Sequence, residues 1–282
     1  MDYNEIALKK AELPCRNCFA ASFFAGMFIA FGALCSQIAS VEFAPCGGKF
    51  AAAAVFPIGL IMVVLVGAEL FTGNNLMAYS VYDRVLGKGA LWKNWLTVYI
   101  GNLIGSLFLV NLVIWGGTYR LFSGRLMKTM IAAAEMKTSL PPCEMFIRAI
   151  GCNILVCIAV WSALKAKGTA GKIIATFLPV FAFVYCGFEH SVANMYFIPV
   201  GMAAQVVGGS SSLTIPFAGL WMNLLMVTMG NIVGGALVVA GGLWLINSTG
   251  ASTGKGQKPE KKDEKDENRR ISLNRIFPKA KR

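Results

Sequence analysis

The sequence predicts an all-helical membrane protein with six membrane-spanning segments, arranged as two three-helix halves of opposite orientation. Three observations lead to this fold class. Hydrophobic residues make up 56% of the 282 residues and charged residues only 14%, whereas soluble domains are about 45–50% apolar and about 25% charged. Six apolar segments are long enough to cross a bilayer as helices, and two polar motifs recur in the same order in both halves of the chain.

The predicted spans follow from length and hydropathy, because a bilayer core needs roughly 20 apolar residues in a helix. An even number of spans places both termini on the same side. Lys and Arg in short loops favour the cytoplasmic side, and they are frequent after the second and fourth spans and in the tail. We therefore expect a multi-pass protein of the plasma (inner) membrane with both termini in the cytoplasm. The six spans are 17–39, 50–81, 94–119, 143–166, 173–202 and 216–246.

The same pattern divides the chain into regions. The formal net charge is +12, and much of the basic excess lies in the tail, whose mixed charges are typical of a solvated, disordered segment near anionic lipid. Nothing aromatic or folded there indicates nucleic-acid binding. The linker between the halves has apolar positions that fit an amphipathic helix at the membrane interface. The regions are a cytoplasmic N-terminal segment (1–16), a transmembrane channel domain (17–247) with repeat one (about 17–119), the interfacial linker (120–142) and repeat two (about 143–247), and the basic tail (248–282).

The second and fifth spans are too long for simple helices, and each contains a polar interruption. Residues 67–74 and 187–194 share the pattern G-x-E-x-x-x-x-N, and residues 101–105 and 230–234 share G-N-x-x-G. Two motifs that recur in the same order indicate an internal repeat. Because each half has three spans, the halves must be inverted, an arrangement that many transporters use to build a site at the membrane midplane.

The interruptions free backbone N–H and C=O groups, which must be satisfied by protein or by pore water. We expect Glu69 and Glu189 to hold the breaks through backbone N–H groups, and Asn74 and Asn194 to hydrogen-bond the loop backbone. His190 is the only histidine. Ionisable groups at membrane depth usually face a bundle interior or a water-filled path, so we interpret this stretch as lining a pore for small anions. The alternative is a buried histidine satisfied by Glu189 or by loop backbone.

These motifs, taken together, resemble those of the formate/nitrite transporter family. The residues that carry the resemblance are LFTGN at 70–74, GN at 101–102, GFEHSVANM at 187–195 and GNIVGG at 230–235. The match runs in order from about residue 18 to residue 247. It implies an aquaporin-like protomer with inverted repeats, assembled as a homopentamer with one pore per protomer, and we expect no enzymatic activity, no cofactor and no metal. The paired Asn-Pro-Ala signature of the aquaporins themselves is absent.

The resemblance also implies a set of pore residues. The family's central histidine falls on His190, the threonine of the first break on Thr72, the asparagine of the sixth span on Asn231, and the lysine before the fourth span on Lys137. Gly73 and Asn74 replace residues that are often Ser and Thr in close formate channels, which leaves the choice of anion open. The apolar constrictions fall on Phe56, Leu60, Leu70, Val156 and Phe183.

These residues suggest a mechanism. A monoanion that enters an apolar constriction loses hydration at a cost of several kcal/mol, and protonation removes most of that cost. Lys137 would attract the anion, His190 would donate a hydrogen bond or a proton, and Thr72 and Asn231 would hold the oxygens. We therefore expect passive, bidirectional passage of small monovalent weak-acid anions, most of all formate, with proton symport inward.

Several alternatives stay open at this point. Nitrite, hydrosulfide and lactate are other candidate anions, although the aromatic Phe56 and Phe183 favour one smaller than lactate. The Cys15-Arg16-Asn17-Cys18 motif and the eight cysteines prompt a membrane redox protein, but a haem held between two histidines needs a second histidine, and a structural zinc needs four ligands. A receptor or scaffold would not explain duplicated polar breaks.

Overall fold

The computed structural model describes residues 3–209 and 214–251, and in these residues every regular element is a helix. The chain divides into two units, Met1–Trp244 and Leu245–Arg282. The second unit is described only up to Ala251, so almost all of the predicted tail lies outside the described residues. The helices are α1 (Tyr3–Glu12), α2 (Cys15–Glu42), α3 (Gly48–Val55), α4 (Ile58–Val66), α5 (Phe71–Asn74), η1 (Asn75–Met77), α6 (Ala78–Tyr82), α7 (Lys88–Trp115), η2 (Thr118–Arg120), α8 (Arg125–Ser139), α9 (Pro142–Lys165), α10 (Gly168–Tyr185), α11 (Ser191–Val207), α12 (Phe217–Ile232), the π-helical η3 (Val233–Ala240) and α13 (Gly241–Ala251).

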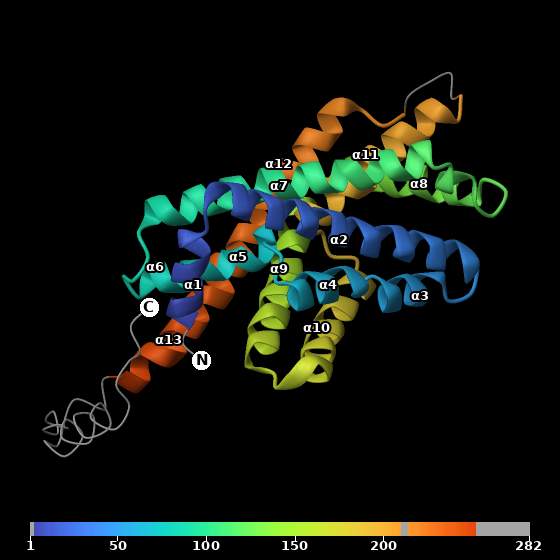
Figure 1. The fold of residues 1–282 in the computed structure, drawn as a ribbon. Helices are drawn as coiled ribbons and strands as arrows, with labels where there is room; N and C mark the ends of the chain where they lie inside the picture. Colours follow the sequence, from blue (N-terminus) through green and yellow to red (C-terminus); the bar gives the residue numbers. More distant parts are fainter. Residues whose placement is uncertain (1–2, 210–213, 252–282) are drawn as a thin grey trace, which may run out of the picture. The chain divides into compact units, whose positions relative to one another are not determined.

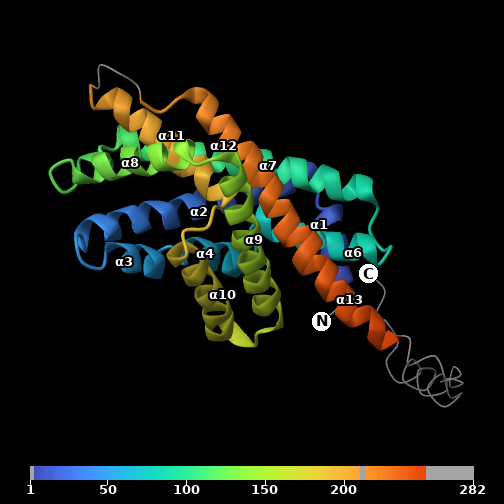
Figure 2. The ribbon, with the colours of Figure 1, turned by 180° about the vertical axis from the view of Figure 1, so that it is seen from behind.

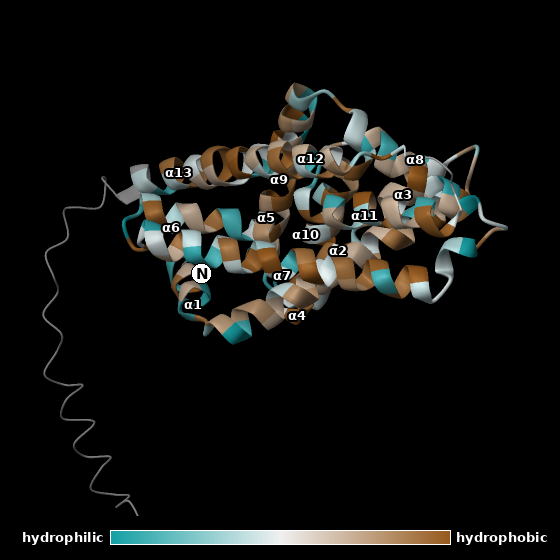
Figure 3. Cartoon of the chain, turned by 90° about the horizontal axis from the view of Figure 1, so that it is seen from above, coloured by the Kyte–Doolittle hydropathy of each residue, from teal (hydrophilic) through white to brown (hydrophobic). Residues whose placement is uncertain are grey.

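Six helical stretches are long and apolar enough to cross a membrane, which confirms the predicted fold class. The first begins at Cys15, two residues earlier than predicted, because Pro14 occupies its N-cap position. Large apolar side chains such as Trp115 are exposed on the outer faces of the helices, and Figure 3 shows hydrophobic residues along α4, α7 and α12. The stretches are Cys15–Glu42, Gly48–Val66, Lys88–Trp115, Pro142–Lys165, Gly168–Tyr185 and Phe217–Ser248.

The second and fifth spans are broken where the repeated glutamate motif predicted. Helix α4 ends at Val66 before α5 begins at Phe71, and α10 ends at Tyr185 before α11 begins at Ser191. Gly67 and Gly187 have φ angles of 75° and 71°. This left-handed conformation stops a helix and is readily adopted only by glycine. The two glycines therefore produce equivalent interruptions in the two halves.

The second repeated motif brings helices into close contact. Helix α2 packs along α7, and α9 packs along α12, as Figures 1 and 2 show for the first pair. A Cβ atom on Gly105 would lie 1.9 Å from the carbonyl oxygen of Phe23, and a Cβ on Gly234 would lie 2.3 Å from that of Ile150. The glycines of G-N-x-x-G thus allow two backbones to touch in each half.

The linker between the halves forms helix α8, which is amphipathic as predicted. Its apolar face packs on α11 instead of facing outward. Leu126, Met130 and Ala134 are fully buried on this face. Gly201 of α11 permits the contact, since a Cβ there would lie 2.4 Å from Cβ of Ala134. Helices α8 and α1 lie at opposite ends of the bundle (Figures 1 and 2).

The close contact of α2 and α7 predicts the effect of a single methyl group. Gly105→Ala is expected to lower the thermal unfolding midpoint of the purified protein, because overpacking typically costs about 1–3 kcal/mol and a backbone carbonyl cannot rotate away. Gly89→Ala is the matched control: it lies in the same helix with no atom within 4 Å of its added Cβ. The control should keep or raise the midpoint, since alanine favours helix. Equal midpoints by circular dichroism would contradict the packing argument.

Candidate functional site

The two helix breaks meet at a contact between Thr72 and His190. Thr72 Oγ1 lies 2.9 Å from His190 Nε2, and both residues are buried. His190 is the N-cap of α11, and its Nδ1 accepts a hydrogen bond from the backbone N–H of Ala193 at 3.0 Å. With Nδ1 as an acceptor, the ring proton is assigned to Nε2, which donates to Thr72. His190 is thus satisfied by loop backbone and by Thr72, not by Glu189.

Each break contains a buried carboxylate that is paired with a lysine. Lys10 Nζ donates to Glu69 at 2.7 Å, and Lys137 Nζ donates to both carboxylate oxygens of Glu189 at 2.9 and 3.1 Å. The expectation that these glutamates accept from backbone N–H groups is therefore wrong. A buried carboxylate needs a compensating charge as well as hydrogen bonds, and the lysine side chains supply both.

Two asparagines complete a polar ring around each carboxylate. Asn74 Nδ2 donates to Glu69 at 2.7 Å and Asn194 Nδ2 donates to Glu189 at 2.7 Å, so these asparagines hold carboxylates and not the loop backbone, as had been expected. Each amide also donates to a further asparagine from the last span of its half. We call the two sets the first ring (Lys10, Glu69, Asn74, Asn94) and the second ring (Lys137, Glu189, Asn194, Asn223).

The rings are closed by the lysine backbone. Asn94 Nδ2 donates to the carbonyl of Lys10 at 3.3 Å, and Asn223 Nδ2 donates to the carbonyl of Lys137 at 2.9 Å. These corresponding hydrogen bonds show that α1 and α8 occupy equivalent places in the two halves. The repeat therefore includes a short helix before each set of three spans.

The asparagines of G-N-x-x-G satisfy the backbone freed by the breaks. Asn231 Oδ1 accepts from the N–H of Ser191 at 2.9 Å, while its Nδ2 donates to the carbonyls of Ala149 and Glu189. Asn102 makes the same set of bonds in the first half, accepting from Phe71. The amide of Asn231 is therefore occupied by backbone, which corrects the expectation that it holds substrate oxygens.

Three ring residues were missed from the sequence, namely Lys10, Asn94 and Asn223. Two further repeated patterns could have revealed them. The pattern K-x-x-L-P precedes the first span of each half, at residues 10–14 and 137–141, and N-x₇-N occurs at residues 94–102 and 223–231. Both patterns are short, and their meaning depends on pairing residues from distant segments.

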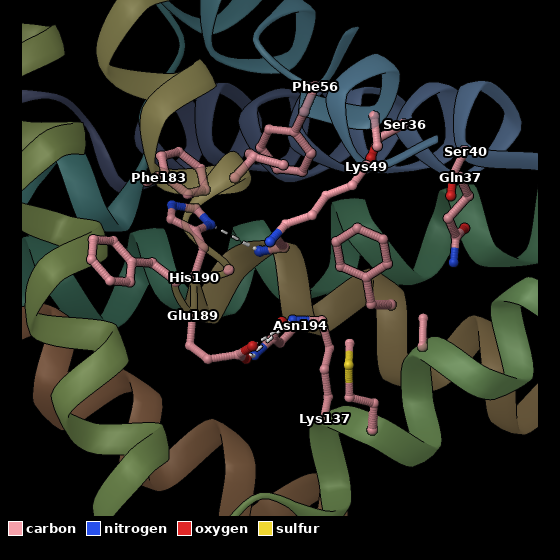
Figure 4. Close-up of a pocket in the computed structure, with 18 of the residues that line it drawn as sticks. Ser36, Gln37, Ser40, Lys49, Phe56, Lys137, Phe183, Glu189, His190 and Asn194 are labelled. Carbon is pink, nitrogen blue, oxygen red and sulfur yellow. Dashed lines mark hydrogen bonds and ion pairs between the residues drawn. The ribbon is translucent and has the colours of Figure 1, made fainter. Parts of the chain in front are cut away.

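Two cavities approach the contact between the breaks. The wider one has a volume of about 550 Å³ and borders Lys137, His190 and the aromatic residues Phe56 and Phe183, as Figure 4 shows. A smaller one of about 220 Å³ borders Lys10, Leu70, Gly73 and Asn74, the last three flanking Thr72 along the chain. Each cavity is thus bordered by the lysine of one ring and by the N-cap residue of one break. These are Lys137 and His190 for the wider cavity, and Lys10 and Leu70 for the smaller one.

The predicted constriction residues are all buried, and all five belong to one hydrophobic core cluster. The rings of Phe56 and Phe183 are edge to face with centroids 5.6 Å apart, and Phe183 stacks on His190 at 5.8 Å. Because α10 ends at Tyr185, before His190, the Phe183 and His190 rings can stack directly. Leu70 borders the smaller cavity, while Leu60 and Val156 border neither.

The cysteines form no metal or disulfide site in the described part of the chain. All eight are free thiols, and residues 3–209 and 214–251 contain no group of three or more His, Cys, Asp or Glu that could hold a metal ion. In the Cys15-x-x-Cys18 motif, Cys15 is exposed and Cys18 is buried.

Comparison with known proteins identifies relatives of this chain. The family model described as formate/nitrite transporter matches residues 2–245. The chain is 38% identical to a probable formate transporter of Methanothermobacter thermautotrophicus over 85% of this chain and 92% of that protein. It is 34% identical to the formate channel FocA of Escherichia coli K12, over 86% and 90%. It is also 36% identical to the nitrite transporter NirC of the same strain, over 68% and 69%.

Solved structures agree with the sequence comparisons. A structure described as an FNT family ion channel superposes with a TM-score of 0.77 at 30% identity, covering 86% of this chain and 96% of that one. A pentameric formate channel with formate bound superposes with a TM-score of 0.73 at 30% identity, covering 83% and 98%. This chain is therefore a multi-pass membrane transport protein, not an enzyme, and it belongs to the formate/nitrite transporter family.

Proposed function

We propose that this protein is a passive, bidirectional channel for small monovalent weak-acid anions, formate first of all, which pass His190 together with a proton. The observation that carries the proposal is the buried contact of His190 with Thr72. The wider cavity borders His190, and the smaller cavity borders Leu70 and Gly73, which lie near Thr72 in the chain. The names of the formate transporter and formate channel relatives support the choice of anion.

The constriction favours a neutral substrate. Phe56 and Phe183 offer no hydrogen bond to replace lost hydration, so a bare anion would pay several kcal/mol to enter between them. A medium of low polarity favours the neutral acid over the anion. The anion therefore takes up a proton within the cavity and crosses as the acid.

His190 serves as a hydrogen-bond donor in this mechanism. Its Nδ1 is held by the N–H of Ala193, so its single proton is on Nε2, and giving that proton away would leave an imidazolate. The proton that travels with the substrate thus comes from the bulk solution, as hydronium carried through the cavity water, which is left as neutral water. Nε2–H donates a hydrogen bond to a substrate oxygen in place of Thr72 Oγ1. The Thr72 hydroxyl then donates a hydrogen bond to the same substrate and keeps its proton. Lys137, although paired with Glu189, adds positive charge near the cavity.

The topology and assembly are part of the same proposal. Basic loops and the basic tail (248–282) lie in the cytoplasm with both termini of a plasma-membrane protein, so the smaller cavity beside α1 faces inward and the wider cavity beside α8 faces outward. The N-terminal segment is 1–16 and the channel domain 17–247. A homopentamer is supported by the likeness to the pentameric formate channel.

Nitrite is the second candidate substrate, favoured by the similarity to a nitrite transporter, and hydrosulfide is a third. Flux of labelled formate into proteoliposomes, measured across pH with each anion as competitor, separates them. The substrate with the lowest half-inhibitory concentration at neutral pH is the favoured one. Stronger inhibition by nitrite than by unlabelled formate would overturn the choice of formate.

Loss of the Nε2–H donor predicts slower formate flux. His190→Ala proteoliposomes should carry formate roughly tenfold more slowly, because leaving a buried polar group without its hydrogen bond costs about 1–3 kcal/mol. His190→Asn keeps an N–H donor and should retain part of the flux. The readout is formate influx by stopped-flow fluorescence between acidic and neutral pH. Wild-type rates and pH dependence in both variants would rule out this role.

The hydroxyl of Thr72 gives a matched pair of variants. Thr72→Val replaces the hydroxyl with a methyl group of similar size and should reduce formate flux several-fold, whereas Thr72→Ser keeps the hydroxyl and should stay near wild type. The hydroxyl supplies one hydrogen bond, which contributes about 1 kcal/mol. Unfolding midpoints measured alongside serve as the control for folding. Equal flux in the two variants would show that Thr72 does not contact the substrate.

A further inference from the structure

The wider cavity contains a polar side chain that the proposed pathway does not use. Gln37, on α2, is 3% exposed and borders this cavity. Neither its amide nitrogen nor its amide oxygen has a hydrogen-bond partner among the described residues. Buried amides are nearly always hydrogen-bonded, because leaving both ends unpaired is costly. An amide directed into a cavity is therefore suited to binding a polar ligand there, and Figure 4 shows Gln37 at the cavity's edge.

The same cavity is bordered by one cation that lacks a counter-charge. Three basic residues lie along it: Lys49, Lys137 and Arg148. Lys137 is paired with Glu189 at 2.9 Å and Arg148 with Glu144 at 2.7 Å. Lys49 forms no ion pair with any residue in the described ranges 3–209 and 214–251. Its Nζ lies over the Tyr185 ring, 5.5 Å from the ring centroid, a contact that leaves the positive charge without a neutralising carboxylate and able to attract an anion in the cavity.

The packing of α2 on α3 places Gln37 and Lys49 along the same cavity. A Cβ on Gly48 would lie 2.7 Å from the carbonyl oxygen of Ser40, so the start of α3 lies against the last turns of α2. Ser36 and Ser40, on the same part of α2, also border the cavity. This wall of the cavity is polar, in contrast to the aromatic pair at its inner end.

We propose that Gln37 and Lys49 form an outer anion-binding site, in which a small monoanion with oxygen acceptors is held while still hydrated, before it reaches Phe56 and Phe183. The amide Nε2 donates to an anion oxygen, the amide oxygen accepts from a water of the anion's hydration shell, and the ammonium group provides the charge. The inference rests on the proposed function for its ligand, formate. The outer site adds a second anion-binding position to the proposed pathway, before the substrate reaches His190.

The site belongs to one side of the channel only. The smaller cavity is bordered by a single cation, Lys10, which is paired with Glu69 at 2.7 Å. No unpaired buried amide corresponding to Gln37 lines it, within the residues that the structure describes. Anion entry from the wider cavity should therefore half-saturate at a lower concentration than entry from the smaller one.

Formate flux into proteoliposomes tests the site through its concentration dependence. Gln37→Leu and Lys49→Met should each raise the half-saturating formate concentration by roughly threefold to tenfold, the effect of one lost hydrogen bond or charge contact, with maximal flux within about twofold of wild type. The Lys49→Met effect should shrink at molar salt, where the Debye length falls to about 3 Å. The Gln37→Leu effect should persist, because it does not depend on charge.

Lys128→Met is the matched control, because Lys128 is an exposed lysine of α8 that does not border the cavity. It should leave the half-saturating concentration unchanged, and a change equal to that of Lys49→Met would reduce the Lys49 effect to general surface charge. Wild-type half-saturation in both Gln37→Leu and Lys49→Met would overturn the site, and Gln37 would then bind water only.

A binding measurement separates this inference from the proposed function. Saturation-transfer NMR of the formate C–H proton, with the purified full-length protein in detergent, reports binding without transport. Weaker transfer in Gln37→Leu than in wild type supports the outer site even if vesicles carry no formate, an outcome that would contradict only the proposed function. Equal transfer in the two proteins would overturn the outer site.

Discussion

A membrane helix cannot be interrupted unless the freed peptide groups find partners, because hydrocarbon offers none. In this protein that constraint is met by amide side chains. Asn102 and Asn231 each accept from one freed N–H and donate to two carbonyls. They can reach the breaks only because the glycines beside them bring their helices into backbone contact with α2 and α9. The site at the junction of the breaks depends on this arrangement.

The sequence predicted the scaffold well because the scaffold is duplicated. Six spans, the two breaks and the family followed from hydropathy and from motifs that occur twice. The partners of the motifs could not be predicted in the same way. Glu69 and Glu189 were expected to bind backbone, but a buried carboxylate also needs a charge, and the lysines that supply it lie more than 50 residues away along the chain (|i−j| of 59 and 52). Periodicity within a segment carries no information about such pairs.

The candidate site was predicted only in part, for a related reason. His190 and Thr72 were expected in the pore and they touch, whereas Asn231 is occupied by backbone. Asn231 differs from His190 and Thr72 in the number of backbone groups that its side chain can bond. An asparagine can satisfy three backbone groups at once, so the structure uses it for the break. The backbone groups that bond the Asn231 amide come from distant segments, so they can be identified only from the packed arrangement of the helices.

The contact between Thr72 and His190 joins the two halves of the molecule, since one residue comes from each repeat. In the proposed mechanism, a substrate that binds the imidazole takes the place of that bond, and the bond forms again when the substrate leaves. On that proposal, these two side chains close the pathway between passages, at a point where the backbones around it are held by asparagines and close-packed glycines. Closure on this proposal needs only side-chain rotations, without a movement of one half of the protein against the other.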